Sequence, residues 1–261
     1  MNRVRIQPDR EAIPRQFHSF LDGADIYDSS CSPTAKVLFL DKGPGFYLKS
    51  APKGTLRREA EMTRFFHSKG LGAEVLGYES LDKDWMLTVR VPGEDCLDPM
   101  YLADPIRLCD TMAELLRMLH DTDPTGCPVP DRTGECLATA RRNYLVKTYG
   151  TEHFPDNWGY ATAEEAWRIV EENGKYLKSD TLIHGDYCLP NILLDNWCFS
   201  GFIDLDAGGM GDLHEDLFWA TWSLGFNLKT DRYRDRFLDA YGRERICDDI
   251  FPVIAAIAVF D

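Results

Sequence analysis

The stretch HGDYCLPNILLDNWCFSGFID at residues 184–204 decides how the rest of the chain is interpreted. It contains two apolar runs, ILL at 192–194 and FSGFI at 199–203, on either side of the turn-forming residues 195–197. Two apolar runs separated by such a cluster predict a β-hairpin. The preceding segment, HGDYCLP, contains a glycine and a proline and is therefore expected to be a loop.

Two polar side chains flank the expected hairpin. Pairing of Ile192 with Ile203 would place the residues next to them, Asn191 and Asp204, opposite each other. Directly opposed residues of an antiparallel pair lie about 4.5–5.5 Å apart, so both side chains can bind one hard cation such as Mg²⁺. Because Mg²⁺ usually completes its shell with water and substrate phosphate oxygens, these residues predict a magnesium and nucleotide site.

Asp186 lies in the loop, five residues before Asn191. A carboxylate beside the metal can accept the proton of a hydroxyl that attacks a γ-phosphate, or orient that hydroxyl. The alternative is that Asp186 caps a turn and Asn191 satisfies loop backbone groups. The combination HGDxxxxN, followed thirteen positions later by Asp204, favours the catalytic interpretation.

Size and charge restrict the class of protein. A chain of 261 residues with 44% hydrophobic and 12% aromatic content can bury a substantial core, as one large domain or two lobes. The formal net charge of −14 opposes nucleic acid as a partner. It suits a cationic small molecule, although an acidic surface can also serve solubility alone.

The eight cysteines form no CxxC pair and no compact framework, so we expect reduced thiols rather than a zinc site or disulfides. The first residues lack the apolar segment of a signal peptide, and the run VIAAIAVF at 253–260 is too short to span a bilayer. A cytoplasmic protein without a membrane partner is expected.

The pattern changes along the chain and predicts an α+β fold of two lobes. Residues 1–91 are expected to form a small sheet with one helix, residues 92–104 a linker, and residues 105–261 a mainly helical lobe. The expected strands are 37–40, 46–49 and 85–91, and the expected helices are 56–69, 106–120, 167–177, 216–226 and 251–260.

The first of these helices carries a carboxylate on its apolar side. At about 100° per residue, Glu59 falls on the same side as the apolar residues of the helix, whereas Glu61 points away. A carboxylate on a buried stripe needs a partner, and Lys49 on the preceding strand is a suitable one. An ordinary surface salt bridge is the alternative.

HGDYCLPN and the later segment GFIDLDAGGMGDLHED at 201–216 resemble the aminoglycoside phosphotransferases, which have a bilobal protein-kinase-like fold. The resemblance runs over most of the chain and is strongest to the 3'-phosphotransferases, the kanamycin kinases. It implies that Asp186 is the catalytic aspartate, that Asn191 and Asp204 bind Mg²⁺, and that Asp216 is structural.

The same resemblance implies how the nucleotide is bound. Lys49 matches the lysine that holds the phosphates, and Glu59 matches its ion-pair partner. The Val89 carbonyl and the Val91 amide match backbone groups that bind the purine, and Ser32 lies in a matching phosphate loop. ATP or GTP is therefore the expected phosphoryl donor.

The acceptor site matches less well. Asp156, Glu152 and Asp261 resemble or replace acids that bind polycationic antibiotics in the family. Other positions depart from the pattern. Phe226, Asn227 and Ala258 stand where some relatives carry acids, and the pair Asp206-Ala207 stands where many relatives have Gly-Arg.

The expected function is an aminoglycoside O-phosphotransferase that modifies the 3'-hydroxyl and gives antibiotic resistance. A kinase of the same fold for a macrolide, choline or a sugar metabolite is one alternative, and a non-catalytic nucleotide-binding protein is another. His184 is expected to organise the loop and His120 to be packed or capping. The spacing of Trp219 and Trp222 favours the core over a sugar-stacking surface.

Overall fold

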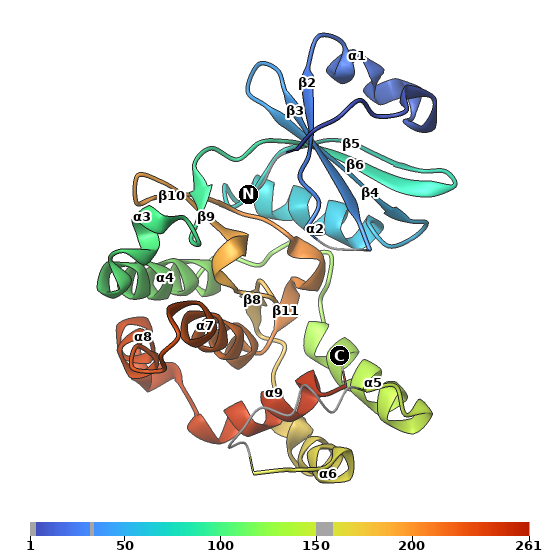
Figure 1. The fold of residues 1–261 in the computed structure, drawn as a ribbon. Helices are drawn as coiled ribbons and strands as arrows, with labels where there is room; N and C mark the ends of the chain where they lie inside the picture. Colours follow the sequence, from blue (N-terminus) through green and yellow to red (C-terminus); the bar gives the residue numbers. More distant parts are fainter. Residues whose placement is uncertain (1–3, 32–33, 150–158, 261) are drawn as a thin grey trace. The chain divides into compact units, whose positions relative to one another are not determined.

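The computed structural model describes residues 4–31, 34–149 and 159–260 (Figure 1). Its contacts divide the chain into two compact units, each described here by itself. Unit 1 comprises Met1–Gly93 and Leu193–Asp206, and unit 2 comprises Glu94–Ile192 and Ala207–Asp261. Unit 1 is rich in sheet and unit 2 in helix, so the α+β composition predicted from the sequence is confirmed.

Unit 1 contains a six-stranded antiparallel sheet with the order β1-β2-β3-β4-β6-β5. The three strands expected from the sequence are its centre, and each begins or ends slightly outside the expected range. The strands are β1 (Val4–Arg5), β2 (Asp25–Asp28), β3 (Lys36–Asp41), β4 (Phe46–Pro52), β5 (Val75–Ser80) and β6 (Lys83–Val89).

Alternation along the central strands gives this sheet two different faces. On one face, residues such as Leu48 pack against Ile13, Phe17 and Leu21 of the N-terminal segment. That segment contains η1 (Arg10–Ala12), η2 (Arg15–Phe17) and α1 (His18–Leu21). On the opposite face, Ala51 and Met86 pack with Leu56 and Ala60, at the start of the helix α2 (Arg57–Ser68).

Helix α2 presents its two glutamates as the sequence predicted. Glu59 is only 5% exposed, whereas the side chain of Glu61 is 43% exposed and pairs with Arg57 at 2.9 Å. The start of the helix is held by the buried Asp84, whose carboxylate accepts the Leu56 amide at 3.0 Å. Burial of one face therefore fixes which glutamate points into unit 1.

The predicted hairpin is present as β9 (Ile192–Asp195) and β10 (Cys198–Phe202), which are hydrogen-bonded neighbours. The two loop residues, Asn196 and Trp197, both have positive φ, at 49° and 69°. This matches a type I′ turn, whose twist suits an antiparallel pair. The expected pairing of Ile192 with Ile203 is wrong, because β10 ends at Phe202 and Ile203 lies outside the strand.

The hairpin belongs largely to unit 1, although the sequence placed it in the helical lobe. The Phe202 amide donates to the Leu71 carbonyl at 2.8 Å, and Phe202 also bridges to Gly72. The Phe202 ring packs edge-on against Phe66 of α2. These contacts are distant in sequence, so the pattern of residues 105–261 does not reveal them.

Unit 2 is built mainly of helices, and α4 contacts α7, α8 and β8 (Figure 1). All four helices expected here are present, and among the described residues three more, α3, α5 and α8, form where none was expected. None of the described helices is long and apolar enough to cross a membrane. The elements are β7 (Glu94–Asp95), α3 (Pro99–Leu102), α4 (Pro105–His120), α5 (Arg132–Val146), α6 (Ala163–Asn173), η4 (Gly174–Tyr176), β8 (Thr181–Ile183), η5 (Leu189–Asn191), β11 (Gly209–Gly211), α7 (Leu213–Leu228), α8 (Arg234–Tyr241), η7 (Arg243–Arg245), η8 (Asp248–Ile250) and α9 (Phe251–Ala258); the short helix η6 (Leu205–Ala207) follows the hairpin.

Gly93 provides a test of how closely the hairpin packs in unit 1. Its φ is +87°, and a Cβ added there would lie 2.1 Å from the Leu194 carbonyl oxygen. Gly126 has the similar φ of +89° but open space around it. We expect Gly126→Ala to cost about 1 kcal/mol through backbone strain, and Gly93→Ala at least about 3 kcal/mol, measured by urea unfolding. Equal costs for the two variants would contradict the close approach.

Candidate active site

The loop at residues 184–191 joins β8 to β9 and is fixed by helices of unit 2. The Tyr187 side chain is fully buried, and its hydroxyl donates to the Met112 carbonyl of α4 at 2.8 Å. The Leu189 amide donates to the Ser223 hydroxyl of α7 at 3.0 Å. The loop is therefore anchored on both sides of the residues that carry its polar groups.

Asp216 of α7 organises the start of this loop. Its carboxylate is fully buried and accepts the amides of His184 and Gly185, each at 2.7 Å. The same carboxylate lies 3.1 Å from His120 Nε2, and His120 Nδ1 lies 2.8 Å from the Tyr241 hydroxyl. The structural role implied for Asp216 thus has a direct physical basis. His120 is buried and contacts both Asp216 and Tyr241. Its position at the end of α4 did not predict these two partners.

Gly185 is required by the path of the loop. Its φ is +80°, and a Cβ added there would lie 2.1 Å from the Ala207 carbonyl oxygen. The next amide, that of Asp186, donates to His184 Nδ1 at 3.3 Å. The expectation that His184 organises the loop through a backbone hydrogen bond is confirmed.

Asp186 and Asn191 are brought together by this arrangement. The Asn191 side-chain amide donates to the Asp186 backbone carbonyl at 2.9 Å and to its carboxylate Oδ2 at 2.8 Å. Both donors of the Asn191 amide are therefore directed at Asp186, and Asn191 Oδ1 keeps its lone pairs for another ligand. Asp186 itself is partly exposed.

Cys188 stands beside Asp186 but is not suited to nucleophilic chemistry. Its amide donates to the Asp186 carbonyl at 2.8 Å, and its side chain is buried. Burial, with the nearby Asp186 charge, raises the pKa of the Cys188 thiol well above its usual range. The thiol stays protonated at neutral pH, and a thiol in that state is a poor nucleophile.

Unit 1 contains a second group of charges, centred on Lys49. The Lys49 ammonium lies 2.8 Å from Glu59 Oε1 and 3.0 Å from Asp204 Oδ1, which confirms the predicted pairing with Glu59. Burial acts to lower the pKa of Lys49, but the charges of Asp204 and Glu59 outweigh it and raise the pKa above its usual value. Lys49 is therefore held as a cation between two carboxylates.

The backbone of Asp204 has a positive φ. It follows β10 with a φ of +56°, which is uncommon for any residue other than glycine. Residues held in such conformations cluster at functional sites, because the surrounding structure must compensate the strain. The Asp204 side chain is 56% exposed, so its carboxylate can accept a ligand in addition to Lys49.

The two valines implied in purine binding lie at the end of β6. The Val89 amide donates to the Glu74 carbonyl at 2.9 Å, while the Val91 side chain is buried with Ala73 and Leu193. Within the described ranges the Val91 amide has no hydrogen-bond partner in the protein. That donor is available to a ligand.

Several residues implied by the family resemblance cannot be placed. Ser32, Glu152, Asp156 and Asp261 lie outside the described residues. Asn191 and Asp204 fall in different units, so their joint role as metal ligands stays a prediction.

The positions that depart from the family pattern carry aromatic rings on α7. Phe226 is 57% exposed and stacks on Trp222, with a centroid distance of 5.1 Å and an interplanar angle of 8°. The Lys229 ammonium lies 4.2 Å from the centre of the Phe226 ring. Trp222 is 47% exposed, so the expectation that it belongs to the core is wrong. Its position on the outer side of α7 leaves it facing away from the buried residues of that helix.

A fixed acidic loop and a lysine held between carboxylates are features expected of a phosphotransferase. A family model described as the phosphotransferase enzyme family matches residues 29–252. The chain belongs to this family.

Within the family, the chain is similar over its full length to aminoglycoside-modifying relatives. It is 48% identical over 260 residues to a probable aminoglycoside 3'-phosphotransferase of Lactococcus lactis subsp. lactis, and the alignment covers 99% of each chain. It is 29% identical over 212 residues to the aminoglycoside 3'-phosphotransferase of Niallia circulans, covering 80% of each chain.

Solved structures show the same fold. An aminoglycoside-3'-phosphotransferase of type VIII has a TM-score of 0.74 at 22% identity, covering 92% of this chain and 94% of that one. An aminoglycoside phosphotransferase of Streptomyces rimosus, in complex with ADP and streptomycin, has a TM-score of 0.71 at 21% identity and covers 95% and 100%. The predicted protein-kinase-like fold is confirmed.

The buried carboxylate of Asp216 gives a testable prediction. In Asp216→Asn an amide replaces one acceptor oxygen, so at least one buried donor loses its partner. We expect a loss of about 3 kcal/mol in the free energy of unfolding, measured by urea denaturation. Asp248→Asn, at an exposed position, serves as the control and is expected to change stability by less than about 0.5 kcal/mol. Similar stability of both variants would contradict the role of Asp216.

Proposed function

We propose that this chain is an Mg²⁺-dependent aminoglycoside O-phosphotransferase that uses ATP or GTP and thereby gives antibiotic resistance. The observation that carries the proposal is the 48% identity, over 99% of both chains, to a probable aminoglycoside 3'-phosphotransferase. The 3'-hydroxyl is accordingly the proposed site of modification.

Asp186 acts on the acceptor in this proposal. The acceptor hydroxyl oxygen forms a bond to the γ-phosphorus, and the bond from that phosphorus to the β,γ-bridging oxygen breaks. The nucleoside diphosphate leaves, and the hydroxyl proton passes to the Asp186 carboxylate. Support comes from the position of Asp186, which is partly exposed and oriented by two hydrogen bonds from Asn191.

Other groups hold the nucleotide. Lys49 binds the α- and β-phosphates, since it is kept charged and pre-oriented by Glu59. The Val91 amide and the Val89 carbonyl bind the purine. Asn191 Oδ1 and the Asp204 carboxylate are hard oxygen donors of the kind that Mg²⁺ prefers, so they fit the expected metal. When bound, Mg²⁺ neutralises phosphate charge during the transfer.

The acceptor is proposed to be a cation. The net charge of −14 favours a polycationic antibiotic over nucleic acid, and Glu152, Asp156 and Asp261 are the proposed acceptor-binding acids. All eight cysteines are free, which is consistent with a reducing cytoplasmic location.

A second candidate is a kinase of the same fold for another small alcohol, such as a macrolide, choline or a sugar metabolite. It is favoured by the exposed ring of Phe226 and by Asn227, which replace family acids on α7. The Asn227 side chain donates to the Ser223 carbonyl at 2.8 Å rather than presenting a charge. An acceptor panel of kanamycin, neomycin, erythromycin and choline, read by mass spectrometry for gain of one phosphoryl group, separates the candidates. Phosphorylation of no aminoglycoside would overturn the first.

Asp186→Asn tests catalysis and separates an enzyme from a non-catalytic nucleotide-binding protein. We expect kcat to fall by about 10²–10⁴-fold, because the variant cannot accept the hydroxyl proton. The KM for nucleotide should stay within about twofold, because Asp186 is not proposed to bind it. Asp249→Asn, an exposed acid in the same unit, is the control in steady-state assays. Equal kcat values for the wild type and Asp186→Asn would contradict the assigned role.

Lys49→Met tests nucleotide binding. Removal of the cation is expected to weaken ADP binding about tenfold or more, measured by isothermal titration calorimetry. Because this variant leaves Glu59 buried without its partner, the double variant Lys49→Met/Glu59→Gln provides a version without an unpaired buried charge. Lys175→Met, at an exposed lysine of unit 2, is the control. Unchanged affinity in both Lys49 variants would refute the assignment.

A further inference from the structure

A groove opens on the face of the unit 1 sheet that is opposite to Lys49. Ser50 lines it, and Lys49 is the preceding residue of β4, so their side chains point to opposite faces of the sheet. The groove lies between the sheet and the N-terminal segment around Ile13 and Pro14, and its volume is about 1090 Å³. This is slightly above the usual range of about 300–1,000 Å³ for small-molecule sites. The proposed phosphotransfer does not use it.

The floor of the groove contains hydrogen-bond donors that the protein does not satisfy. Ser50 is 7% exposed, and in the part of the chain that the structure describes its hydroxyl makes no hydrogen bond. Trp85, directly opposite Ser50 in the ladder, is partly buried, and its indole N–H likewise has no partner among the described residues. Both side chains line the groove, so a bound acceptor group can pair with these donors.

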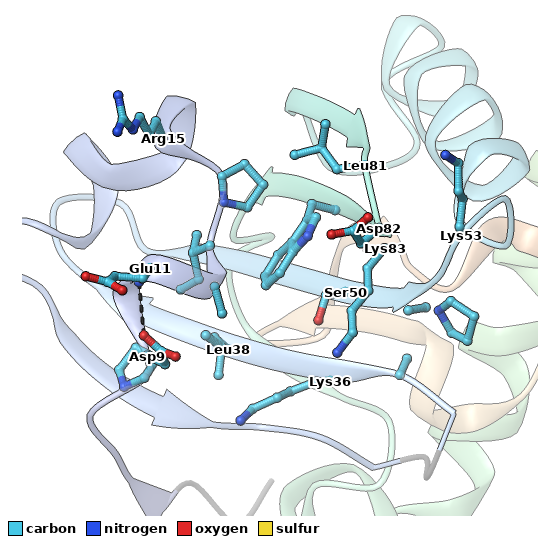
Figure 2. A pocket seen from close by; sticks show the side chains of 18 of the residues that line it. Asp9, Glu11, Arg15, Lys36, Leu38, Ser50, Lys53, Leu81, Asp82 and Lys83 are labelled. Carbon is cyan, nitrogen blue, oxygen red and sulfur yellow. Dashed lines mark hydrogen bonds between the residues drawn. The ribbon is translucent and has the colours of Figure 1, made fainter.

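Cations flank these donors. Lys36 lies opposite Ser50 on β3, and Lys83 lies two positions before Trp85 on β6, so both share the face of the groove. Figure 2 shows Lys83 extending along the sheet toward Ser50. Across residues 4–31, 34–149 and 159–260, neither Lys36 nor Lys83 forms an ion pair within 4 Å.

The rest of the lining is largely apolar. Trp85 and Leu38 form its sheet side, and Ile13 and Pro14 form its other side. The acids on the rim, Asp9, Glu11 and Asp82, are outnumbered by cations, and Asp9 already accepts the Glu11 amide at 3.0 Å (Figure 2). The Ser50 end therefore offers donors and positive charge beside an aromatic surface, in a chain whose overall charge is strongly negative.

We propose that this groove binds a small aromatic organic anion. The aromatic part lies against Trp85 and Leu38, and the anionic group is held by Lys36, Lys83 and the Ser50 hydroxyl. The chemistry favours an anion because Lys36 and Lys83 carry positive charge and the Ser50 hydroxyl can donate to an anionic group. The aromatic part is favoured because a planar ring can stack on the indole of Trp85.

The test uses the full chain without nucleotide, and Lys49→Met, on the opposite face of the sheet, should leave binding of the probe unchanged if the nucleotide site does not take it up. Naphthalene-2-sulfonate is the probe, titrated by calorimetry and by the indole N–H signal of Trp85, which is assigned with Trp85→Phe. We expect saturable binding of one probe per chain with a dissociation constant of about 1 mM or lower. Naphthalene-2-methanol, which lacks charge, and inorganic sulfate, which lacks the ring, should each bind about tenfold more weakly or not at all.

Matched variants locate the site. Lys36→Gln/Lys83→Gln should weaken binding of the probe about tenfold, whereas Lys175→Gln, an exposed lysine of unit 2, should leave it unchanged. Ser50→Ala removes the buried hydroxyl and should weaken binding by a smaller factor. Absence of saturable binding, equal binding of naphthalene-2-methanol, or unchanged binding in the double lysine variant would each overturn the proposal.

Discussion

A single buried carboxylate, that of Asp216, determines the path of the loop that carries Asp186. Taking a carboxylate out of water costs several kcal/mol unless hydrogen bonds compensate for it. Here the compensation comes from the amides of His184 and Gly185 and from His120. Because two of these donors are backbone groups of the loop, satisfying the carboxylate also fixes the loop.

This constraint extends in both directions from Asp216. Beyond His120 it reaches the Tyr241 hydroxyl of α8, so three helices share one polar network. Along the loop, the fixed amides are followed directly by Asp186, whose carboxylate is then oriented by Asn191. In unit 1 the same principle holds for Lys49, which is kept charged by two carboxylates instead of being held in an apolar pocket. In each unit, burial of the charge is tolerated because Asp216 and Lys49 each have several partners.

Sequence reasoning predicted the parts of the fold and site that depend on local pattern. Helix α4 was predictable because its apolar residues recur at helical spacing, and Glu59 was predictable because it interrupts such a stripe. Helix α5 was missed because it buries small or polar residues, Thr133, Cys136 and Ala140, which give no apolar periodicity. The segment around Phe17 that covers the sheet was missed because it consists of one-turn elements.

The partners of Asp216 could not be predicted, because contact with His120 spans 96 residues and contact between His120 and Tyr241 spans 121. No local spacing rule applies at such separations, and a histidine at the end of a helix is more often a cap. Trp222 was misjudged for a related reason, since the spacing of two tryptophans does not say which side of α7 is covered. The unsatisfied donors beside Trp85 were also invisible, because they are defined by strand register.

The most direct test of this account is hydrogen exchange of the His184 and Gly185 amides, followed by NMR at neutral pH. Both amides donate to a carboxylate that has no contact with water, so they should exchange as slowly as the buried amides in the centre of α4. Exchange at the rate of exposed loop amides would show that Asp216 does not hold the loop, and would contradict the account.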